Sequence, residues 1–341
     1  MVEHDPGRVV CLGEALVVLR PDRPGGPGAS DLLRCSVGGA EGNVAGALAD
    51  MGVDTTWVSR LGADPFGDLV ERDLRARGVQ VVAERDPDRV TGAYLKDSAA
   101  TGSRMFYYRT GSAASVMDGG LLAEPEVARQ LASCHLVHSS GITAGILAPD
   151  SDLFARLVEA RERHGFLLSI DLNWRPAVWR GRDTRALHEL LGAADVLLLG
   201  ADEARAVLGT SDPAGLRRIV GPRPRLVVKS DSHAATEVAP DGRSTRVPAL
   251  DVEVVEPVGA GDGFAAGYLA GLLGGYGATQ RLRLGHLVAA GVLAEPGDHA
   301  HPPAADVRRA LVGATAEDWR ATRVGPDGIG SPALHAIGGS R

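Results

Sequence analysis

The stretch EPVGAGDGFAAGYLAGLL, residues 256–273, crowds three glycines and an aspartate into the few positions before an apolar, helix-like run. Glycine weakens a helix, but just before one it lets the backbone approach a ligand closely. The helix adds unpaired N–H donors and the positive end of its dipole, which together make an anion site. The segment Gly259-Ala260-Gly261 therefore predicts a cradle for a phosphate group, followed by a helix over 262–273.

Two interpretations fit Asp262. A carboxylate in the first turn of a helix is a common stabiliser of the helix N-terminus. Alternatively, Asp262 accepts a proton from a hydroxyl while the adjacent N–H groups hold a transferring phosphoryl group. The helix-end N–H groups predict a lowered pKa for Asp262. Phosphoryl transfer tolerates this, because its loose transition state needs the hydroxyl oriented more than deprotonated early. Spacing alone leaves both interpretations open.

A second glycine-rich string, VGGAEGNVAGALADMG, covers residues 37–52. Gly38 and Gly39 permit close approach by a ligand, and the amide of Asn43 can donate and accept hydrogen bonds with hydroxyl groups. Asn43 would equally serve as a helix cap. Apolar residues then recur at helical spacing as far as Met51, and Gly52 predicts the end of that helix.

Elsewhere the chain alternates short apolar runs with longer helix-like segments. The apolar runs are residues 9–13, 134–141, 166–173, 195–200 and 225–230. Helices are expected over 151–164 and 183–192. Near-continuous apolar strands with helical crossovers predict an α/β fold with a mostly parallel sheet covered on both faces. In such a sheet, ligands bind beyond the carboxyl ends of the strands.

Two segments break this alternation. Residues 14–37 contain PDRPGGPGAS, and residues 83–114 alternate apolar and polar side chains around a turn. Both predict antiparallel ribbons that leave the parallel sheet and form a small β lid over the cleft. A ribbon alone is marginal in water, so the lid is also expected to pair two copies of the chain into a dimer.

The tail 322–341 is rich in glycine and proline and is expected to be flexible. The core that remains comprises residues 1–13, 38–82 and 115–321.

The 341-residue chain carries a net charge of −7, and 44% of its residues are hydrophobic. These values are typical of a globular protein and argue against nucleic acid or an anionic membrane as the main partner. Cys11, Cys35 and Cys134 are widely spaced and form no CxxC pair, which favours reduced thiols and a cytoplasmic location. The polar N-terminus MVEHDPGR indicates neither a signal peptide nor a membrane span.

Taken together, the two glycine-rich strings resemble the signature regions of the ribokinase-like, PfkB-type carbohydrate kinases. The first matches GG-x-x-x-N-x-A and the second matches GAGD-x-F-x-x-G, and the similarity runs from about residue 8 to about residue 311. The resemblance implies a three-layer α/β/α sandwich with a β lid, and phosphorylation of a sugar-like hydroxyl. It implies ATP and Mg²⁺ as cofactors and leaves a requirement for a monovalent cation open.

By the same resemblance, Asp262 is the catalytic base and the N–H groups of residues 259–261 form the anion hole. Glu203, in GADEA, matches a glutamate that organises Mg²⁺ and phosphate in that family. The family usually has Asn three positions earlier, where this chain has Gly200. Glu256 likewise stands where the family usually has Asp.

On the nucleotide side, Lys229 and Ser230 open a segment that resembles the family pattern K-x-G-x-x-G and would contact the nucleotide. Both glycines of that pattern are replaced, by Asp231 and Ala234. These departures bear on ATP affinity and nucleotide preference.

Arg109 and Arg175 bear on the choice of substrate. Each could clamp a carboxylate bidentately, which a neutral sugar would not require, and each could equally form an ion pair within the protein. Tyr94 and Tyr107 offer hydroxyl groups at the end of an apolar face. The stretches YYRTGSA and DLNWRPAVW resemble the corresponding ones of 2-keto-3-deoxygluconate kinases.

That resemblance implies transfer of the γ-phosphoryl group of ATP to the terminal hydroxyl of 2-dehydro-3-deoxy-D-gluconate or a close relative. A fructokinase or another hexose kinase of the same family is the alternative. The residues that would hold the sugar acid are Gly39, Asn43, Tyr94, Tyr107, Arg109 and Arg175, with Asp298 near the reacting end.

Two other classes of protein compete with a kinase. A dinucleotide oxidoreductase would need GxGxxG after the first strand and an acidic partner for the ribose, and the sequence has neither there. A regulator that binds a sugar acid on a kinase scaffold without catalysis stays open, because the nucleotide-side residues depart from the family pattern.

Overall fold

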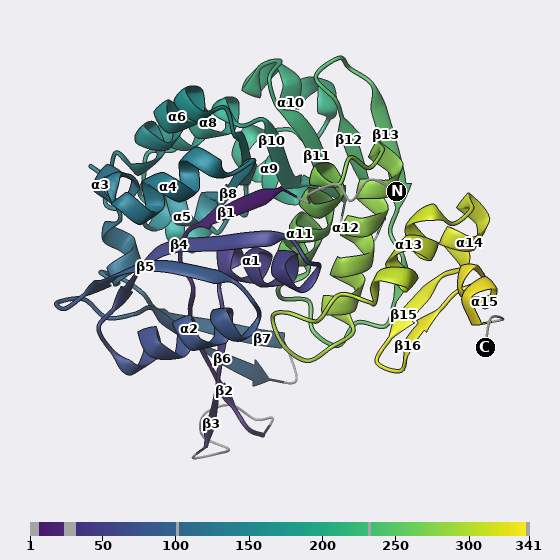
Figure 1. The fold of residues 1–341 in the computed structure, drawn as a ribbon, viewed down its shortest axis with the longest axis horizontal. Coiled ribbons are helices and arrows are strands. Elements are labelled where there is room, and N and C mark those ends of the chain that lie inside the picture. The colour runs from purple at the N-terminus through teal and green to yellow at the C-terminus, as the bar shows by residue number, and fades with distance from the viewer. Residues whose placement is uncertain (1–6, 24–31, 100–101, 231–232, 339–341) are drawn as a thin grey trace.

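A nine-stranded sheet runs through the centre of the computed structural model, which describes residues 7–23, 32–99, 102–230 and 233–338 (Figure 1). The strand order is β13-β12-β11-β10-β9-β8-β1-β4-β5, parallel from β11 to β5, with β12 and β13 added antiparallel. The five apolar runs predicted as strands form β1, β8, β9, β10 and β11, so that prediction is confirmed. The strands are β1 Arg8–Leu12, β4 Asp54–Gly62, β5 Gln80–Asp86, β8 Leu136–Ser140, β9 Leu167–Asp171, β10 Val196–Gly200, β11 Arg225–Ser230, β12 Ala234–Val238 and β13 Ser244–Pro248.

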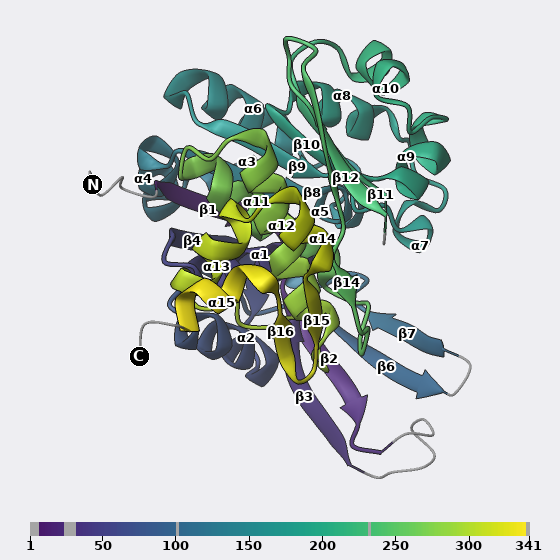
Figure 2. The same cartoon turned by 90° about the vertical axis from the view of Figure 1, so that its right-hand side faces the viewer.

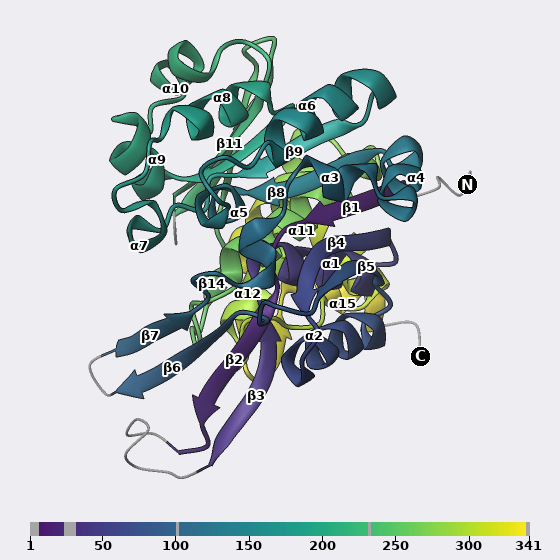
Figure 3. The same cartoon turned by 90° about the vertical axis from the view of Figure 1, so that its left-hand side faces the viewer.

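Helices cover both faces of this sheet. Successive residues of a strand point to opposite sides, so a strand with consecutive apolar residues needs a layer of helices on each face to bury them. In β1, Val9 and Cys11 belong to one buried cluster and Val10 and Leu12 to another. The first face carries α1 Ala40–Asp50, α2 Pro65–Ala76, α11 Ala260–Leu273, α12 Ala278–Leu293 and α13 Ala305–Gly313. The second carries α3 Gly119–Ala123, α4 Pro125–Ser133, α6 Leu153–His164, α8 Arg185–Ala193, α9 Ala201–Leu208 and α10 Pro213–Val220 (Figure 3). The predicted three-layer α/β/α architecture is confirmed.

Three short helical segments complete this part of the chain: η1 Ala113–Val116, α5 Gly141–Ile146 and α7 Pro176–Trp179. The helices α5 and α7 follow β8 and β9 at their carboxyl ends, which is the edge of the sheet where ligands are expected. Within the described ranges, none of the helices combines the length and the apolar character needed to cross a bilayer.

A separate four-stranded sheet projects from the body of the molecule (Figure 2). Its order is β3-β2-β6-β7, built from β2 Leu16–Pro21, β3 Leu33–Gly38, β6 Ala93–Ala99 and β7 Gly102–Tyr108. The pairs β2/β3 and β6/β7 are antiparallel ribbons, and a parallel pairing of β2 with β6 joins them. We call this sheet the lid.

The expected lid segment 83–114 begins too early. Residues up to Asp86 belong to β5, which pairs with β4 in the large sheet. Because β5 is an edge strand with partly exposed side chains, its sequence alternates as a ribbon strand would. The lid part of this segment therefore starts at β6.

The expectation of a flexible tail over 322–341 is wrong for residues 322–338. They form β15 Arg323–Gly325, β16 Gly328–Gly330 and α15 Pro332–Gly338, after α14 Ala316–Ala321. The strand β15 pairs with β14 Asp251–Val252, and Gly328, at φ 117°, helps to form the turn between β15 and β16 (Figure 2). Pro326, between β15 and β16, and Gly328 are thus part of the turn of a small sheet. Residues 339–341 lie outside the described ranges.

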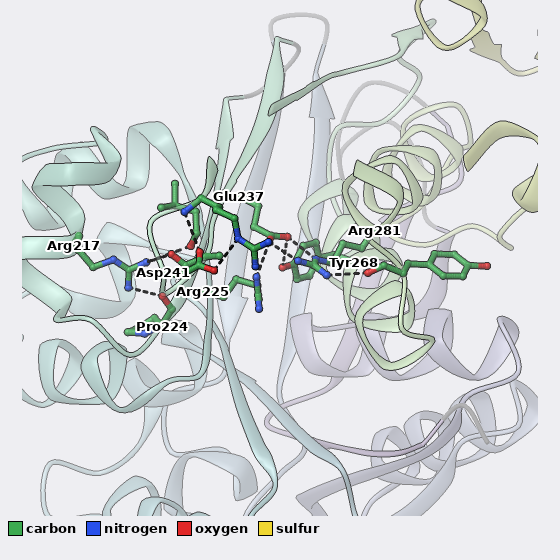
Figure 4. Close-up of polar contacts among 11 residues, drawn as sticks. Arg217, Pro224, Arg225, Glu237, Asp241, Tyr268 and Arg281 are labelled. Atoms are coloured by element: carbon green, nitrogen blue, oxygen red, sulfur yellow. Dashed lines mark hydrogen bonds and ion pairs between the residues drawn. The ribbon is translucent and has the colours of Figure 1, made fainter. Parts of the chain in front are cut away.

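The buried carboxylate of Glu237 holds the helices α11 and α12 against the sheet. Glu237 of β12 accepts hydrogen bonds from Arg281 of α12, from Tyr268 of α11 at 2.9 Å and from Arg225 of β11 at 2.7 Å (Figure 4). Burial alone would raise the pKa of Glu237, but hydrogen bonds from Arg281 and Tyr268 and the neighbouring arginine charges lower it below its usual value. This network holds α11, whose N-terminus enters the cleft, against the sheet.

Candidate active site

A cleft of about 480 Å³ opens between the lid and the carboxyl ends of the large sheet. Its floor is the start of α11, and its walls come from α1, from the lid and from the loops after β1 and β9. The structure brings together in this one cleft every residue predicted to hold the sugar: Gly39, Asn43, Tyr94, Tyr107, Arg109, Arg175 and Asp298. Asp262, Gly259 and Gly261 line it as well.

The glycine turn at 259–261 has the geometry that the sequence predicts. Gly259 has φ 84°, a left-handed conformation that favours glycine, and a Cβ there would overlap the carbonyl oxygen of Asp298. Helix α11 begins at Ala260, so the first N–H groups after the turn have no partner within the helix. They are available for an anion at the floor of the cleft.

Asp262 lies in the first turn of α11 and accepts a hydrogen bond from the Nδ2 of Asn43 at 2.8 Å. Burial raises the pKa of Asp262 to about 7, although the Asn43 hydrogen bond acts in the opposite direction. The expected lowering of this pKa is therefore wrong, because desolvation outweighs the helix-end N–H groups. A carboxyl group that titrates near neutral pH is suited to act as a general base.

Asn43 does not cap a helix, because it lies inside α1, which starts at Ala40. Its backbone N–H bonds to the carbonyl of Gly39 at 2.8 Å, and its buried side chain is directed to Asp262. The turn before it again needs glycine: Gly39 has φ 125°, and a Cβ there would lie 2.5 Å from the carbonyl oxygen of Glu14.

A second cleft, of about 810 Å³, shares the glycine turn with the first. Its apolar side chains include those of Leu250, Val252, Phe264 and Leu293, and Ala260 and Gly261 lie at the end that meets the sugar cleft. An apolar slot that ends at a helix N-terminus can take a base at one end and phosphates at the other. Arg320 of α14 also lines this cleft, although no motif around it predicted a role there.

Lys229 and Glu203 line both clefts. The Lys229 ammonium lies 2.7 Å from the carboxylate of Asp171, and Glu203 accepts a hydrogen bond from the backbone N–H of Gly200 at 3.1 Å. Burial alone would lower the pKa of Lys229, but Asp171 and Glu203 raise it, so the ammonium stays charged. Burial and the charge of Asp171 raise the pKa of Glu203.

The other residues predicted on the nucleotide side are placed differently. Among the described residues, Ser230 is not part of either cleft wall, whereas Ala234 lines the second one and pairs with Ser230 in the β11–β12 hairpin. Asp231 lies outside the described residues.

Each arginine of the cleft already holds a carboxylate of the protein. Arg109 forms an ion pair with Glu14, which is 2% exposed and also accepts a hydrogen bond from Ser112 at 2.8 Å. Arg175 is half-exposed and lies 3.3 Å from Glu203. Of the two interpretations, the ion pair is therefore present for both arginines, and a clamp on a substrate would require them to change partner.

Three carboxylates or amides of the cleft were missed from the sequence: Glu14, Asp171 and Asn173. A signal existed for all of them, since Glu14 follows β1, Asp171 is the last residue of β9, and Asn173 comes just after it. Polar side chains at the carboxyl ends of parallel strands are expected to line a ligand site. Asn173 also has φ 36°, which is unusual for a residue other than glycine.

The described residues contain no group of three His, Cys, Asp or Glu side chains placed to enclose a metal ion. Mg²⁺ does not need such a group, because it usually binds through one or two carboxylates together with waters and substrate phosphates. The carboxylates of Glu203, which lines both clefts, and Asp171, which lines the first, fit that role.

Comparisons with known proteins agree with this geometry. The model of the family described as pfkB family carbohydrate kinase matches residues 7–305. A 2-dehydro-3-deoxygluconokinase of Bacillus subtilis is 29% identical over 304 residues, covering 85% of this chain and 90% of that protein. A fructokinase of Klebsiella pneumoniae is 33% identical over 271 residues, covering 78% and 84%.

Solved structures show the same fold. A PfkB protein from Polaromonas sp. JS666 is 30% identical and superposes with a TM-score of 0.72, covering 83% of this chain and 95% of that chain. A fructokinase from Xylella fastidiosa with bound ATP is 21% identical, with a TM-score of 0.72 and coverage of 85% and 93%.

Proposed function

The chain belongs to the pfkB family of carbohydrate kinases, and from this we propose that it transfers the γ-phosphoryl group of ATP to the terminal hydroxyl of a sugar acid, 2-dehydro-3-deoxy-D-gluconate or a close relative. The observation that carries the proposal is the position of Asp262. This carboxyl group, with a pKa near neutrality, lies beside the glycine turn that both clefts share. A hydroxyl held in the first cleft and a phosphate held in the second would therefore meet at Asp262.

In this mechanism, Asp262 accepts the proton of the sugar hydroxyl, and Asn43 orients the carboxylate through its hydrogen bond. The N–H groups at the turn 259–261 stabilise the charge of the transferring phosphoryl group. Lys229, at the junction of the clefts and with its ammonium next to Gly261, would hold the phosphates beside the turn. Mg²⁺, bound through Glu203 and Asp171 together with the phosphates, would neutralise the phosphate charge.

The sugar-acid specificity rests on Arg109 and Arg175, which reach the first cleft from the lid and from the loop after β9. Arg175 is half-exposed and its contact with Glu203 is 3.3 Å long, so it can move to a substrate carboxylate at little cost. A bidentate guanidinium–carboxylate pair would then fix the acid end of the sugar. The Bacillus subtilis relative named above supports this choice of substrate.

A fructokinase is the second candidate. The ion pair of Arg109 with buried Glu14 supports it, because this arginine is already neutralised and a neutral sugar would not need it. The Klebsiella pneumoniae relative supports it as well.

A steady-state assay of ADP release on a substrate panel tests these alternatives. The panel holds 2-dehydro-3-deoxygluconate, its galactonate epimer, fructose and ribose, each with ATP and Mg²⁺. We expect the highest kcat/KM with the sugar acids. A preference for fructose would overturn the sugar-acid assignment. Calorimetric binding of a sugar acid without any ADP release would instead indicate the non-catalytic regulator.

We further propose that the chain forms a dimer through the lid and acts in the cytoplasm. Leu33, Phe106 and Tyr108 are exposed on lid strands and would be covered by a second copy. Cys11, Cys35 and Cys134 are all free thiols, as expected for a reducing compartment. Light scattering of the purified chain and of Phe106→Asp tests the dimer, which is excluded if both variants have the monomer mass.

A further inference from the structure

A buried lysine connects the lid to the glycine turn. Lys96 lies on β6 of the lid and is only 1% exposed. Its ammonium forms an ion pair with Glu256 and lies 3.8 Å from the Oδ1 of Asp298. Both carboxylates lie in loops of the body, Glu256 before α11 and Asp298 after α12, so the contact crosses from the lid to the body.

The two carboxylates support the glycine turn from opposite sides. Glu256 starts the segment that leads into the turn, and its other oxygen accepts the backbone N–H of Val258 at 3.2 Å. Asp298 contributes the carbonyl oxygen that Gly259 packs against, and its carboxylate accepts a hydrogen bond from Tyr94 of the lid. A shift of either residue would displace the backbone that forms the predicted anion hole.

The charge at this contact depends on Lys96. Two partly buried carboxylates within reach of one another repel each other, and the ammonium between them offsets that repulsion. The sequence contains only two lysines, Lys96 and Lys229, and both lie at the site, although the chain is rich in arginine. An ammonium is a compact point charge with three donors that can turn toward either carboxylate, whereas a guanidinium is a rigid planar fork.

We propose that Lys96 is a positioning residue that makes the anion hole depend on the position of the lid; this rests on the kinase function proposed above. With the lid against the body, the ammonium holds Glu256 and Asp298 and thereby fixes the turn at Gly259. When the lid lifts, the ammonium withdraws, the carboxylates repel each other and the turn relaxes. The phosphate site is thus fully formed only when the lid covers the sugar.

Lys96→Met tests the proposal, because it keeps the length of the side chain and removes its charge. We expect kcat to fall by about 10- to 100-fold, with a smaller change in the KM for the sugar, because a small displacement of the anion hole affects the transition state most. Arg104→Met is the matched control, since Arg104 is an exposed lid cation that lies over Phe106. It should keep kcat within about twofold. Equal kcat values for both variants would overturn the proposal.

A second variant distinguishes two causes of a lower kcat in Lys96→Met: repulsion between the two carboxylates and a general loss of folding. In Lys96→Met/Glu256→Gln the uncompensated carboxylate is neutral, so the double variant should recover part of the lost kcat and of the lost melting temperature. If the double variant has the same kcat and melting temperature as Lys96→Met, repulsion between the carboxylates is not the cause of the losses.

Hydrogen exchange gives a readout that does not depend on activity. The amides of residues 256–263 should exchange faster in Lys96→Met than in the native chain or in Arg104→Met. Unchanged exchange there overturns the coupling even if the chain is an active kinase. Faster exchange in a chain that releases no ADP with any sugar would uphold the coupling and reject the proposed kinase function.

Discussion

Asn43 donates its side-chain amide to the carboxylate of Asp262 at 2.8 Å, although 219 positions separate the two residues in the chain. The contact joins the two glycine-rich strings recognised in the sequence at a single point, where α1 meets the N-terminus of α11. Three of the predictions below concern this point and the turn beside it, one concerns the two arginines of the first cleft, and one concerns the network that supports α11.

Asp262→Asn should lower kcat by about 10²–10⁴-fold and leave sugar binding nearly unchanged, because an amide keeps the shape of the side chain but cannot accept the proton. Asp306→Asn, in the first turn of α13, is the matched control for a helix-end carboxylate. Steady-state kinetics and calorimetry check both variants. Near-normal kcat in Asp262→Asn would show that Asp262 only stabilises its helix.

The pH dependence of kcat/KM should show the titration of Asp262. Burial raises its pKa to about 7, and a base must be deprotonated to act, so kcat/KM should fall as the pH drops through 7. Asn43→Ala removes a hydrogen bond that favours the charged form, so it should move this limb to higher pH. An acid limb that stays near pH 4 in the native chain would contradict the assignment.

Arg175→Ala should reduce kcat/KM for sugar acids far more than for fructose, because only the acid has a carboxylate to clamp. We expect a loss of about 10- to 100-fold on the acid, as for a charge-assisted hydrogen bond worth about 1.5–3 kcal/mol. Arg180→Ala, an exposed arginine just after α7, is the control. Arg109→Ala should show the same selectivity, and equal losses on both sugars would favour the fructokinase.

Gly259→Ala should reduce both kcat and stability, because the left-handed backbone disfavours alanine and its Cβ would overlap the carbonyl oxygen of Asp298. Gly275→Ala is the control: Gly275 has φ 71°, but a Cβ there would meet nothing within 4 Å. It should destabilise by only about 1 kcal/mol and keep kcat. Similar kcat values for the two variants would show that the turn is not part of the anion site.

Glu237→Gln should lower the free energy of unfolding by about 3–5 kcal/mol, because the charges of Arg281 and Arg225 then lose their buried counter-charge. Asp241→Asn removes an exposed pair with Arg243 and should leave the urea midpoint nearly unchanged. Urea unfolding followed by circular dichroism measures both. If Glu237→Gln loses as little stability as Asp241→Asn, this network does not hold α11 against the sheet.

The sequence predicts the large sheet, the lid ribbons and the glycine turn well, because each depends on local residue patterns. Gly259 and Gly39 both have the left-handed conformations that their positions in the motifs imply. The predicted direction of the pKa shift of Asp262 was wrong, because the shift depends on burial. Only the packing of α1, α11 and the lid determines that burial. The position of Glu14 after β1 was a usable signal, but its ion pair with Arg109 could not be predicted, because Arg109 follows the distant strand β7.

The C-terminal segment shows a different limit. Glycine and proline are as common in tight turns as in flexible tails, so composition could not distinguish the hairpin of β15 and β16 from disorder. What decides is the pairing of β15 with β14 and the burial of Trp319, whose indole N–H donates to the carbonyl of Pro248 at 3.0 Å. Both depend on residues that are far apart in the sequence, so composition alone does not reveal them.

That pairing has a consequence for the order in which the protein is made. The residues of β14 line the second cleft, yet their partner strand β15 follows them only after α11, α12, α13 and α14 have been made. During translation the segments before β15 can fold first, while this wall of the cleft waits for β15 to be made. A polypeptide interrupted before residue 323 would carry most of the sugar-side groups but lack a finished compartment for the nucleotide.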